Sequence, residues 1–189
     1  MQDKILEKMV KRKMAIKILL TGRPGVGKTT VIKKIARALG ERAGGFFTEE
    51  IREKGKRVGF AIEALGGRRG ILAHKGMKSK FRVGRYRVNL AGIEEIGVAA
   101  VREAVAQRKV LVIDEIGKME LCSEEFRKAL VEAFDADTPL VATIMLKDIG
   151  LTRALKTSSD ARVIEITKEN RDGLIKEVIS QVREGGLVE

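Results

Sequence analysis

The chain is poor in the residue types that define several classes of protein. Its 189 residues include no tryptophan, one histidine, one cysteine and two prolines. The single cysteine, Cys122, excludes an intramolecular disulfide and suits a reducing compartment. The single histidine, His74, has no second metal-binding residue at the usual spacing, so we assign it no role. Proline-rich linkers, internal repeats and low-complexity tracts are absent from the sequence.

Long apolar runs are also missing. No stretch reaches the roughly 18 apolar residues that a membrane helix needs, so we expect no membrane association. Residues 1–13 lack the continuous apolar core of a signal peptide, and we expect a cytoplasmic protein. We interpret residues 1–13 as an N-terminal extension, either a frayed helix or the product of an upstream start codon. Residues 14–189 are predicted to form a single domain, expected to be a monomer, although the sequence does not fix the oligomeric state.

Positive charge is abundant but unevenly spread. The formal net charge is +12, from 38 lysines and arginines against 26 acidic residues. The segment Arg52–Arg87 contains 12 basic residues and two acidic ones, within a β-rich basic region at about residues 45–90. Such a cluster attracts nucleic acid, an acidic partner or polyphosphate. A solvated hairpin region without a ligand explains the same composition, and the sequence leaves both interpretations open.

Apolar periodicity predicts that strands and helices alternate along the chain. Lys17–Leu20 predicts a strand buried on both faces, and the helix after it ends at Gly40. Further helices are predicted from Ile93, from Ser123 as the N-cap, and from Asn170 to about Glu184. The remaining runs predict strands: GGFFTEEI, RVGFAIEAL and RGILAHK as antiparallel hairpins, the extended piece FRVGRYRVNL, then VLVI, PLVATIML and ARVIEIT. This alternation predicts an α/β fold with a mainly parallel sheet flanked by helices.

The segment Gly22–Thr29, GRPGVGKT, fits the phosphate-binding pattern G-x-x-x-x-G-K-[ST] without a mismatch. Its glycines let successive backbone N–H groups converge on phosphate oxygens. Lys28 is predicted to reach the β- and γ-phosphates, and the Thr29 hydroxyl to bind Mg²⁺. The helix that begins here adds the positive end of its dipole to the same anion. The segment therefore predicts a site for a nucleotide and its magnesium ion.

A second motif, VLVIDEIG, places two acids at the end of an apolar strand. Asp114 would lie at the carboxyl edge of the sheet, where it can hold Mg²⁺. Glu115 would orient or deprotonate a water molecule in line with the γ-phosphorus, although a surface ion pair also explains it. We predict Lys28, Asp114 and Glu115 as catalytic residues, and Thr29 and Asp114 as the metal ligands.

Two details stay open at this stage. Charge that develops on the γ-phosphoryl oxygens calls for a cation besides Lys28. The sequence offers several such cations, each also explained as a solvated surface residue: Lys118, Arg153, Arg82, Arg85 and Arg87. The segment TKENRDGL lies between the last strand and the last helix, where Asn170 or Arg171 can face the base and Thr167 can instead cap the helix.

Five segments carry a family resemblance, in this order from about Ile16 to Val182: TGRPGVGKTT, GGFFTEEIR followed by RVGF, FRVGRYRVNL, VLVIDEIGKMEL and TKENRDGL. Together they resemble the small nucleoside-triphosphatase family of P-loop proteins, first met in thermophiles and with a human cancer-related counterpart. The phosphate loop alone is generic, but DEIGKMEL together with GGFFTEE is far more specific.

The resemblance implies a compact P-loop NTPase with a core related to AAA+ and RecA proteins, plus a β-hairpin insertion. It implies slow hydrolysis of ATP, GTP, CTP, UTP and TTP with Mg²⁺. It favours Asn170 and Arg171 as residues near the base. It also implies nucleotide contacts in two segments: Gly22, Arg23, Pro24, Gly25, Val26, Gly27, Lys28, Thr29 and Thr30, and Val110, Leu111, Val112, Ile113, Asp114, Glu115, Ile116 and Gly117.

Two other functions fit the same scaffold. A nucleotide or nucleoside kinase would need an acceptor pocket and a lid, and the chain shows no obvious arginine-rich lid. A nucleotide-gated nucleic-acid-binding ATPase would use the basic region, but its interleaved aromatic residues are sparse: Phe60, Phe81 and Tyr86. We therefore predict a Mg²⁺-dependent nucleoside-triphosphate phosphohydrolase, with nucleic-acid binding as an unproven second property.

Overall fold

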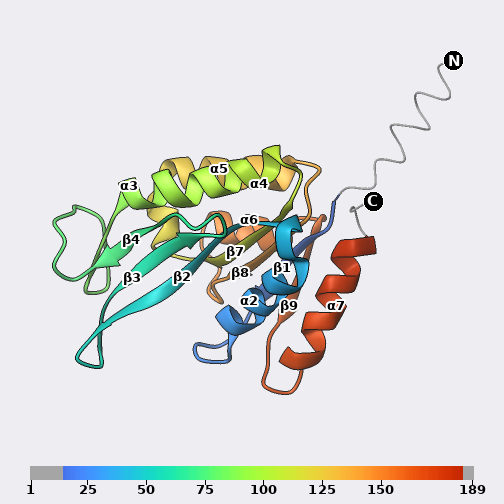
Figure 1. The fold of residues 1–189 in the computed structure, drawn as a ribbon, viewed down its shortest axis with the longest axis horizontal. Helices are drawn as coiled ribbons and strands as arrows, with labels where there is room; N and C mark the ends of the chain where they lie inside the picture. Colours follow the sequence, from blue (N-terminus) through green and yellow to red (C-terminus); the bar gives the residue numbers. More distant parts are fainter. Residues whose placement is uncertain (1–14, 185–189) are drawn as a thin grey trace, which may run out of the picture.

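The computed structural model describes residues 15–184. The predicted extension at residues 1–13, and Gly185 and Gly186, which were expected to end the last helix, lie outside these residues. The described part forms one nine-stranded sheet in the order β5-β6-β4-β3-β2-β7-β8-β1-β9, with helices packed above and below it (Figure 1). The strands are β1 (Lys17–Thr21), β2 (Ala43–Glu53), β3 (Lys56–Ala64), β4 (Arg69–His74), β5 (Arg82–Val83), β6 (Tyr86–Val88), β7 (Val110–Ile116), β8 (Leu140–Ile144) and β9 (Ala161–Glu165).

The sheet has a parallel part and an antiparallel part. Strands β2, β7, β8, β1 and β9 run parallel to their neighbours in that order. Strands β3, β4, β6 and β5 continue the same sheet beyond β2 through antiparallel pairs. The predicted α/β fold with a parallel centre is confirmed, and the three short runs predicted to pair antiparallel do so. Strand β2 belongs to both parts, because it pairs with β7 on one side and with β3 on the other.

The helices cover both faces of the parallel part. Helices α4 and α5 lie together on one face, and α2 and α7 lie together on the other (Figure 1). The α-helices are α2 (Lys28–Leu39), α3 (Leu90–Gly92), α4 (Ala99–Ala106), α5 (Glu124–Asp135), α6 (Leu151–Thr157) and α7 (Arg171–Glu184). A π-helical segment, η2 (Ile93–Val98), joins α3 to α4, and the short 3₁₀ turns are η1 (Gly40–Arg42) and η3 (Glu120–Cys122). Helix α6 was not predicted from the sequence. Within residues 15–184, no helix is long and apolar enough to cross a membrane.

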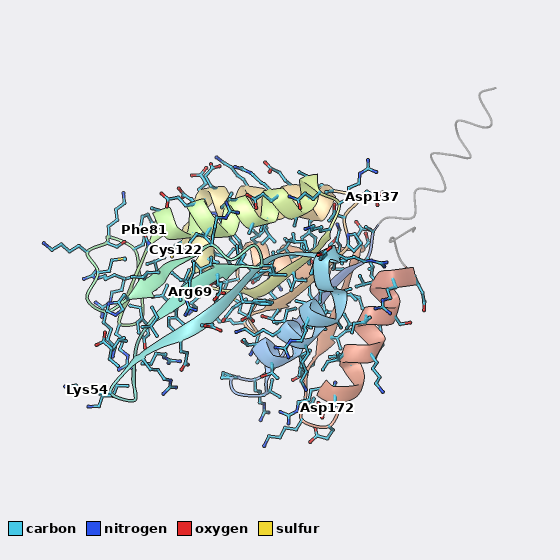
Figure 2. All side chains as sticks on the ribbon, viewed as in Figure 1. Lys54, Arg69, Phe81, Cys122, Asp137 and Asp172 are labelled. Atoms are coloured by element: carbon cyan, nitrogen blue, oxygen red, sulfur yellow. The ribbon has the colours of Figure 1, made fainter. Side chains whose placement is uncertain are left out.

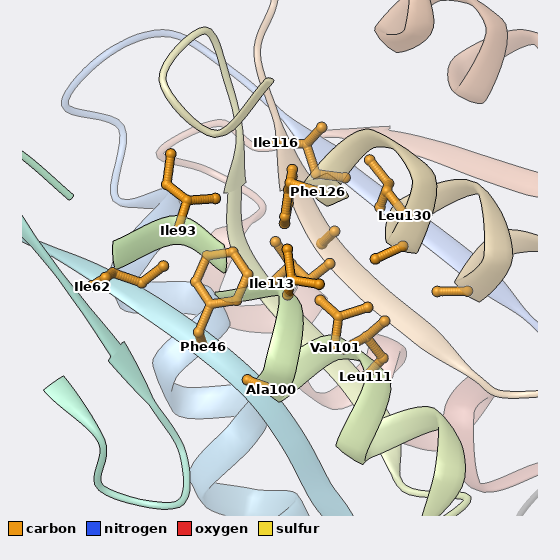
Figure 3. Packing of buried hydrophobic residues seen from close by; sticks show 14 of the residues in the cluster. Phe46, Ile62, Ile93, Ala100, Val101, Leu111, Ile113, Ile116, Phe126 and Leu130 are labelled. Carbon is orange, nitrogen blue, oxygen red and sulfur yellow. The ribbon is translucent and has the colours of Figure 1, made fainter. Parts of the chain in front are cut away.

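Both faces of the central strands are buried, because side chains alternate across a strand. Leu19, Leu111 and Ile113 pack in a cluster with α4 and α5, whereas Ile18 and Leu20 pack in a second cluster with α2 and α7. Figure 3 shows Phe46 and Phe126 within the first cluster. Their rings pack edge to face, with 5.8 Å between the ring centroids. Each fully buried apolar side chain of this size contributes about 1.5–3 kcal/mol, so these two layers hold the strand ends in place.

Lys17, the first residue of β1, is a charged residue in this core. It is 0% exposed, and its Nζ donates hydrogen bonds to the carbonyl oxygens of Ala133, Ala136 and Thr138, at 3.0, 2.7 and 2.6 Å. These carbonyls lie in the last turn of α5 and just beyond it, where backbone acceptors lack helical partners. Burial lowers the pKa of Lys17 to about 8, while the nearby acids, above all Asp137, oppose that shift. The lysine therefore joins the end of α5 to the strand that leads into the phosphate loop.

Candidate active site

The predicted phosphate loop follows β1 and leads directly into α2. Gly25 and Gly27 have φ values of 78° and 104°, in the left-handed region that residues with a side chain rarely adopt. A Cβ added to Gly22 would lie 2.7 Å from the carbonyl oxygen of Ile166, so the loop passes close to the end of β9. Glycine is therefore required at Gly22 and Gly27 for different reasons, close approach at one and backbone conformation at the other.

The side chains of the loop are arranged around its backbone. Lys28 Nζ donates to the carbonyl oxygens of Gly22 and Arg23, at 3.0 and 3.3 Å, so the lysine folds back across the loop. Thr29 and Thr30, at the start of α2, are exposed, and Arg23 and Pro24 are exposed in the loop. The Lys28 ammonium group and the N-terminus of α2 therefore lie together at this loop, as a phosphate site requires.

Asp114 lies beside this loop, at the carboxyl end of β7. The Thr29 hydroxyl donates to Asp114 Oδ1 at 3.2 Å, and the backbone N–H and hydroxyl of Thr48 each lie 3.4 Å from Oδ2. The carboxyl group is 1% exposed. Burial raises the pKa of Asp114 to about 6, and its hydrogen bonds to Thr48 and Thr29 limit the rise. The two segments that the sequence analysis placed around one magnesium ion are therefore in contact.

The residues present suit that ion. A threonine hydroxyl and a buried carboxylate are the hard oxygen ligands that Mg²⁺ prefers, and Mg²⁺ usually takes few protein ligands beside phosphates and water. Within residues 15–184, no group of three or more acidic, histidine or cysteine side chains forms a separate metal cage. Thr29 and Asp114 would hold the ion, which would neutralise charge on the bound phosphates.

A β-bulge turns Glu115 away from Asp114. Ile113 lies opposite Ala142 in β8 and Ile116 lies opposite Ile144, so three steps in β7 match two steps in β8. The backbone of Glu115 accommodates the extra residue of the bulge with a φ of 87°, an uncommon value for a residue with a side chain. The result is that Asp114 is buried, Glu115 is exposed, and the isoleucines on either side pack in the same core cluster.

The rest of the predicted VLVIDEIG segment divides into core residues and one loop glycine. Val110, Leu111, Val112, Ile113 and Ile116 are 0% exposed, so their side chains do not reach the site and instead fix the position of the acids. Gly117 donates its N–H to Glu120 Oε2 at 3.1 Å. A Cβ on Gly117 would lie 3.0 Å from both Glu115 Oε1 and Glu120 Oε2, so these two carboxyl groups face the same point.

Glu120 is a buried acid that the sequence analysis did not select. It is 3% exposed, and burial, with a smaller effect from Glu115, raises its pKa to about 8. The group is therefore protonated at neutral pH. Its position in a polar-looking segment, GKMEL, gives no signal of burial, because an isolated glutamate usually lies on the surface.

The segment after β9 faces the phosphate loop. A cavity of about 580 Å³ lies between residues 23–26 and residues 165–169. The side chain of Asn170 is engaged within the segment, accepting from the Thr167 N–H at 2.9 Å and donating to the Glu165 carbonyl at 2.8 Å. Arg171 Nη1 lies 3.4 Å from the Val26 carbonyl oxygen. Arg171 is therefore a direct neighbour of the phosphate loop, whereas Asn170 makes its hydrogen bonds within its own segment.

The five predicted cations lie in different places. Lys118 is exposed and lines a smaller cavity together with Glu115. Arg82 and Arg87 donate to the carbonyl oxygens of Gly84 and Ser79, and Arg85 lies over the ring of Tyr86. Arg153 is exposed on α6. The structure places Lys118 in the same cavity as Glu115, whereas Arg82, Arg85 and Arg87 make their contacts within the basic region.

Two further groups near the site were missed. Thr48 is in β2, whose register with β7 places Phe46 beside Ile113, so Thr48 comes next to the acids. Glu49, the next residue, forms ion pairs with Lys33 and, at 3.2 Å, with Arg69 (labelled in Figure 2). Knowing that β2 and β7 are adjacent and parallel would have revealed Thr48, but sequence periodicity alone does not give strand order.

The phosphate loop follows β1, the acidic pair lies near the end of β7, and β8 lies between these two strands. This arrangement defines a P-loop protein that binds nucleoside triphosphates. A family model described as "NTPase" matches residues 17–179. The nucleoside-triphosphatase THEP1 of Thermotoga sp. (strain RQ2) is 47% identical over 168 residues, covering 89% of this chain and 96% of that protein. The cancer-related nucleoside-triphosphatase of Homo sapiens is 38% identical over 186 residues, covering 90% of this chain and 98% of that protein.

A solved structure agrees with these relatives. The crystal structure of THEP1 from the hyperthermophile Aquifex aeolicus matches with a TM-score of 0.81 and 42% identity, covering 88% of this chain and 99% of that one. The chain belongs to this family of nucleoside-triphosphatases. The family resemblance and the enzyme class predicted from the sequence are confirmed.

Proposed function

We propose that the protein hydrolyses nucleoside triphosphates to diphosphates and phosphate, with Mg²⁺ held by Thr29 and Asp114. Lys28 binds the β- and γ-phosphates, and Glu115 orients and deprotonates the attacking water. The observation that carries the proposal is the contact of Thr29 with buried Asp114, beside an exposed Glu115 aimed elsewhere by the bulge. This arrangement supplies a metal site and a separate base within one short segment.

Glu115 is a better base than the other acids nearby. Asp114 accepts from Thr29 and lies within hydrogen-bonding distance of Thr48, and Glu49 is neutralised by Lys33 and Arg69. Glu115 has no ion pair among those found in residues 15–184 and is exposed to solvent. Its carboxylate is therefore free to accept a proton from water. Lys118, in the same cavity, is the best placed of the predicted cations to balance charge on the γ-phosphoryl group.

The cavity beside the loop favours acceptance of several bases. Specific recognition of a base needs side-chain amides or charged groups directed at its edge. The lining at residues 23–26 and 165–169 contains no asparagine, glutamine or aromatic residue, and its charged residues, Arg23, Glu165, Lys168 and Glu169, are exposed to solvent. The amide of Asn170 is already bound to Thr167 and Glu165. We therefore propose that ATP, GTP, CTP, UTP and TTP are all substrates.

We propose that the basic region is a structural insertion on the core and does not bind nucleic acid. Four of the twelve basic residues between Arg52 and Arg87 form ion pairs, for example Arg57 with Glu50 and Arg69 with Glu63. Tyr86 is 6% exposed and packs edge to face on Phe60, so it offers no free ring for a base. Lys54 lies at the outer tip of the β2–β3 hairpin (Figure 2). Phosphate release that is unchanged by added RNA or DNA is the expected result.

Phosphate release from the five triphosphates, with and without Mg²⁺, tests the proposal. Glu115→Gln is expected to reduce turnover at least 100-fold while nucleotide binding, measured by calorimetry, stays within about threefold. Glu95→Gln removes the same charge at an exposed position outside the site and is expected to behave as the native protein. Native turnover in Glu115→Gln would remove this residue as the base, and equal turnover without a divalent metal would remove the metal site.

A further inference from the structure

A second cavity adjoins the acidic pair. It has a volume of about 250 Å³, and Thr48, Glu115 and Lys118 line one side of it. Thr48 also lies within hydrogen-bonding distance of Asp114, and Glu115 directly follows Asp114 in β7. Glu115, which the proposed function places beside the attacking nucleophile, therefore lies on the wall of this cavity.

The cavity is much larger than a single nucleophilic water requires. One water molecule occupies about 30 Å³ of liquid, several times less than this volume. Sites for drug-sized ligands have volumes of roughly 300–1,000 Å³, so a second nucleotide is too large for it. The size fits a small molecule that lies against the base.

The far wall comes from the antiparallel part of the sheet. Phe60 of β3, Leu72 of β4 and Val83 of β5 line it, together with Met145, which follows β8. These strands lie beyond β2 and take no part in holding the phosphate loop. The wall is apolar, whereas the side toward the nucleotide carries a hydroxyl, a carboxylate and an ammonium group.

Buried Glu120 completes the polar side. One of its oxygens accepts from the Gly117 N–H, and the residue lines the cavity with Glu115. Burial favours the neutral form of Glu120, the negative charges of Glu115 and Asp114 act in the same direction, and Lys118 lines the same cavity. A neutral carboxyl group can donate a hydrogen bond to a ligand oxygen without adding a second negative charge beside the base.

We propose that this cavity binds a small molecule with a hydroxyl group on an apolar body, and that the γ-phosphoryl group is transferred to that hydroxyl. The proposal rests on the proposed function, because Glu115 activates the nucleophile in both reactions. The acceptor oxygen forms a bond to the γ-phosphorus, and the bond from that phosphorus to the β–γ bridging oxygen breaks. The nucleoside diphosphate leaves, and the hydroxyl proton passes to Glu115. Water takes the acceptor's place in hydrolysis.

Product analysis by ³¹P NMR separates the two reactions. The native protein is incubated with ATP, Mg²⁺ and one probe from each of two classes: 1,2-propanediol as a neutral alcohol and lactate as a hydroxy acid. We expect a phosphomonoester with at least one probe, in a ratio to free phosphate at least tenfold above the molar ratio of probe to water. A preference for lactate would indicate that Lys118 binds the carboxylate of the acceptor. A preference for the diol would indicate that the apolar wall selects the acceptor.

A cavity-filling variant locates the acceptor. Val83→Phe extends a half-buried side chain into the cavity from a short edge strand, and Val83→Leu does so by less. We expect Val83→Phe to lower the ester-to-phosphate ratio at least tenfold, and Val83→Leu to lower it by less, while phosphate release stays within twofold. Val58→Phe makes the same change at a half-buried strand position outside the lining and is expected to leave the ratio unchanged.

The outcomes distinguish this proposal from the proposed function. Phosphate release with no ester from either probe would overturn acceptor transfer and leave hydrolysis intact. An ester-to-phosphate ratio that Val83→Phe does not change would also overturn it, because the acceptor would then bind elsewhere. Absence of both products would contradict the proposed function itself.

Discussion

The Thr29 hydroxyl donates a hydrogen bond to Asp114 Oδ1 at 3.2 Å, although the two residues are 85 positions apart in the chain. Thr29 lies in the first turn of the helix after the phosphate loop, and Asp114 lies near the carboxyl end of β7. Because strand β8 separates their parent strands in the sheet, the contact depends on the packing of three strands and α2. It ties the phosphate-binding and acidic segments into a single site.

Thr29→Ala should weaken the metal site without unfolding the protein. The change removes one hydroxyl ligand and the donor to Asp114, so we expect the Mg²⁺ concentration for half-maximal phosphate release to rise at least tenfold. Magnesium titrations of phosphate release measure this directly. Thr157→Ala, an exposed position at the end of α6, serves as the control. An unchanged magnesium requirement in Thr29→Ala would show that the hydroxyl does not bind the ion.

Glu115 should limit stability as well as support activity. A side chain at φ 87° is strained, and glycine relieves that strain. We expect Glu115→Gly to be more stable than Glu115→Ala by about 1 kcal/mol, with both variants inactive. Urea unfolding gives the difference, and comparison with alanine cancels the loss of the carboxylate. Equal stability of the two variants would mean that the bulge relaxes without cost.

Glu120 should make stability depend on pH. Its pKa is about 8 in the folded protein against an ordinary value of 4.5, so between these values the folded state keeps a proton that the unfolded state has released. The free energy of unfolding should therefore fall as pH rises from 4.5 to 8. Glu120→Gln keeps an acceptor for the Gly117 N–H but does not titrate. At about 1.4 kcal/mol per pKa unit, its advantage over the native protein should reach a few kcal/mol at pH 8.

Urea unfolding at pH 5, 6.5 and 8 tests this difference. Asp114, whose pKa is about 6, adds to the slope in both proteins and cancels in the comparison. Glu95→Gln, at an exposed position, should retain the native slope. Parallel pH profiles for Glu120→Gln and the native protein would contradict a protonated Glu120.

Lys17→Met should destabilise the fold without changing the chemistry. Methionine fits the volume but leaves the carbonyl oxygens of Ala133, Ala136 and Thr138 without this donor. Buried acceptors left unpaired cost about 1–3 kcal/mol, which corresponds to a decrease in Tm of several degrees for a chain of this length. Calorimetry measures Tm, and phosphate release at 25 °C should remain native. Lys34→Met, on the exposed side of α2, should change Tm little, and a similar loss there would argue against a special role for Lys17.

The sequence predicted the elements that depend on local pattern. Five apolar residues of α2 recur at helical spacing, and all five of them are buried: Val31, Ile32, Ile35, Ala36 and Leu39. Ser123 accepts from the Phe126 N–H as the predicted N-cap of α5. Helix α6 was missed because its seven residues bury only Thr152 and Leu155, too few to give a periodic signal.

The site was predictable where a motif fixes the chemistry and unpredictable where folding brings residues together. The loop pattern identified Lys28 and Thr29, and the end of an apolar strand identified Asp114. Strand order and the bulge are tertiary features, so neither Thr48 nor the outward turn of Glu115 could be read from spacing. Glu120 is buried beside a cavity that residues of β3, β4 and β5 also line, an arrangement that no local pattern reveals.

The position of β8 between β1 and β7 has a consequence for the reach of the site. Adjacent strands are about 4.8 Å apart, so one intervening strand sets the mouths of the two outer ones roughly 10 Å from each other. A chain of phosphates would fit across that width. Inserting or removing a strand here would change the distance between the phosphate loop and the acidic pair, and with it the contact of Thr29 with Asp114.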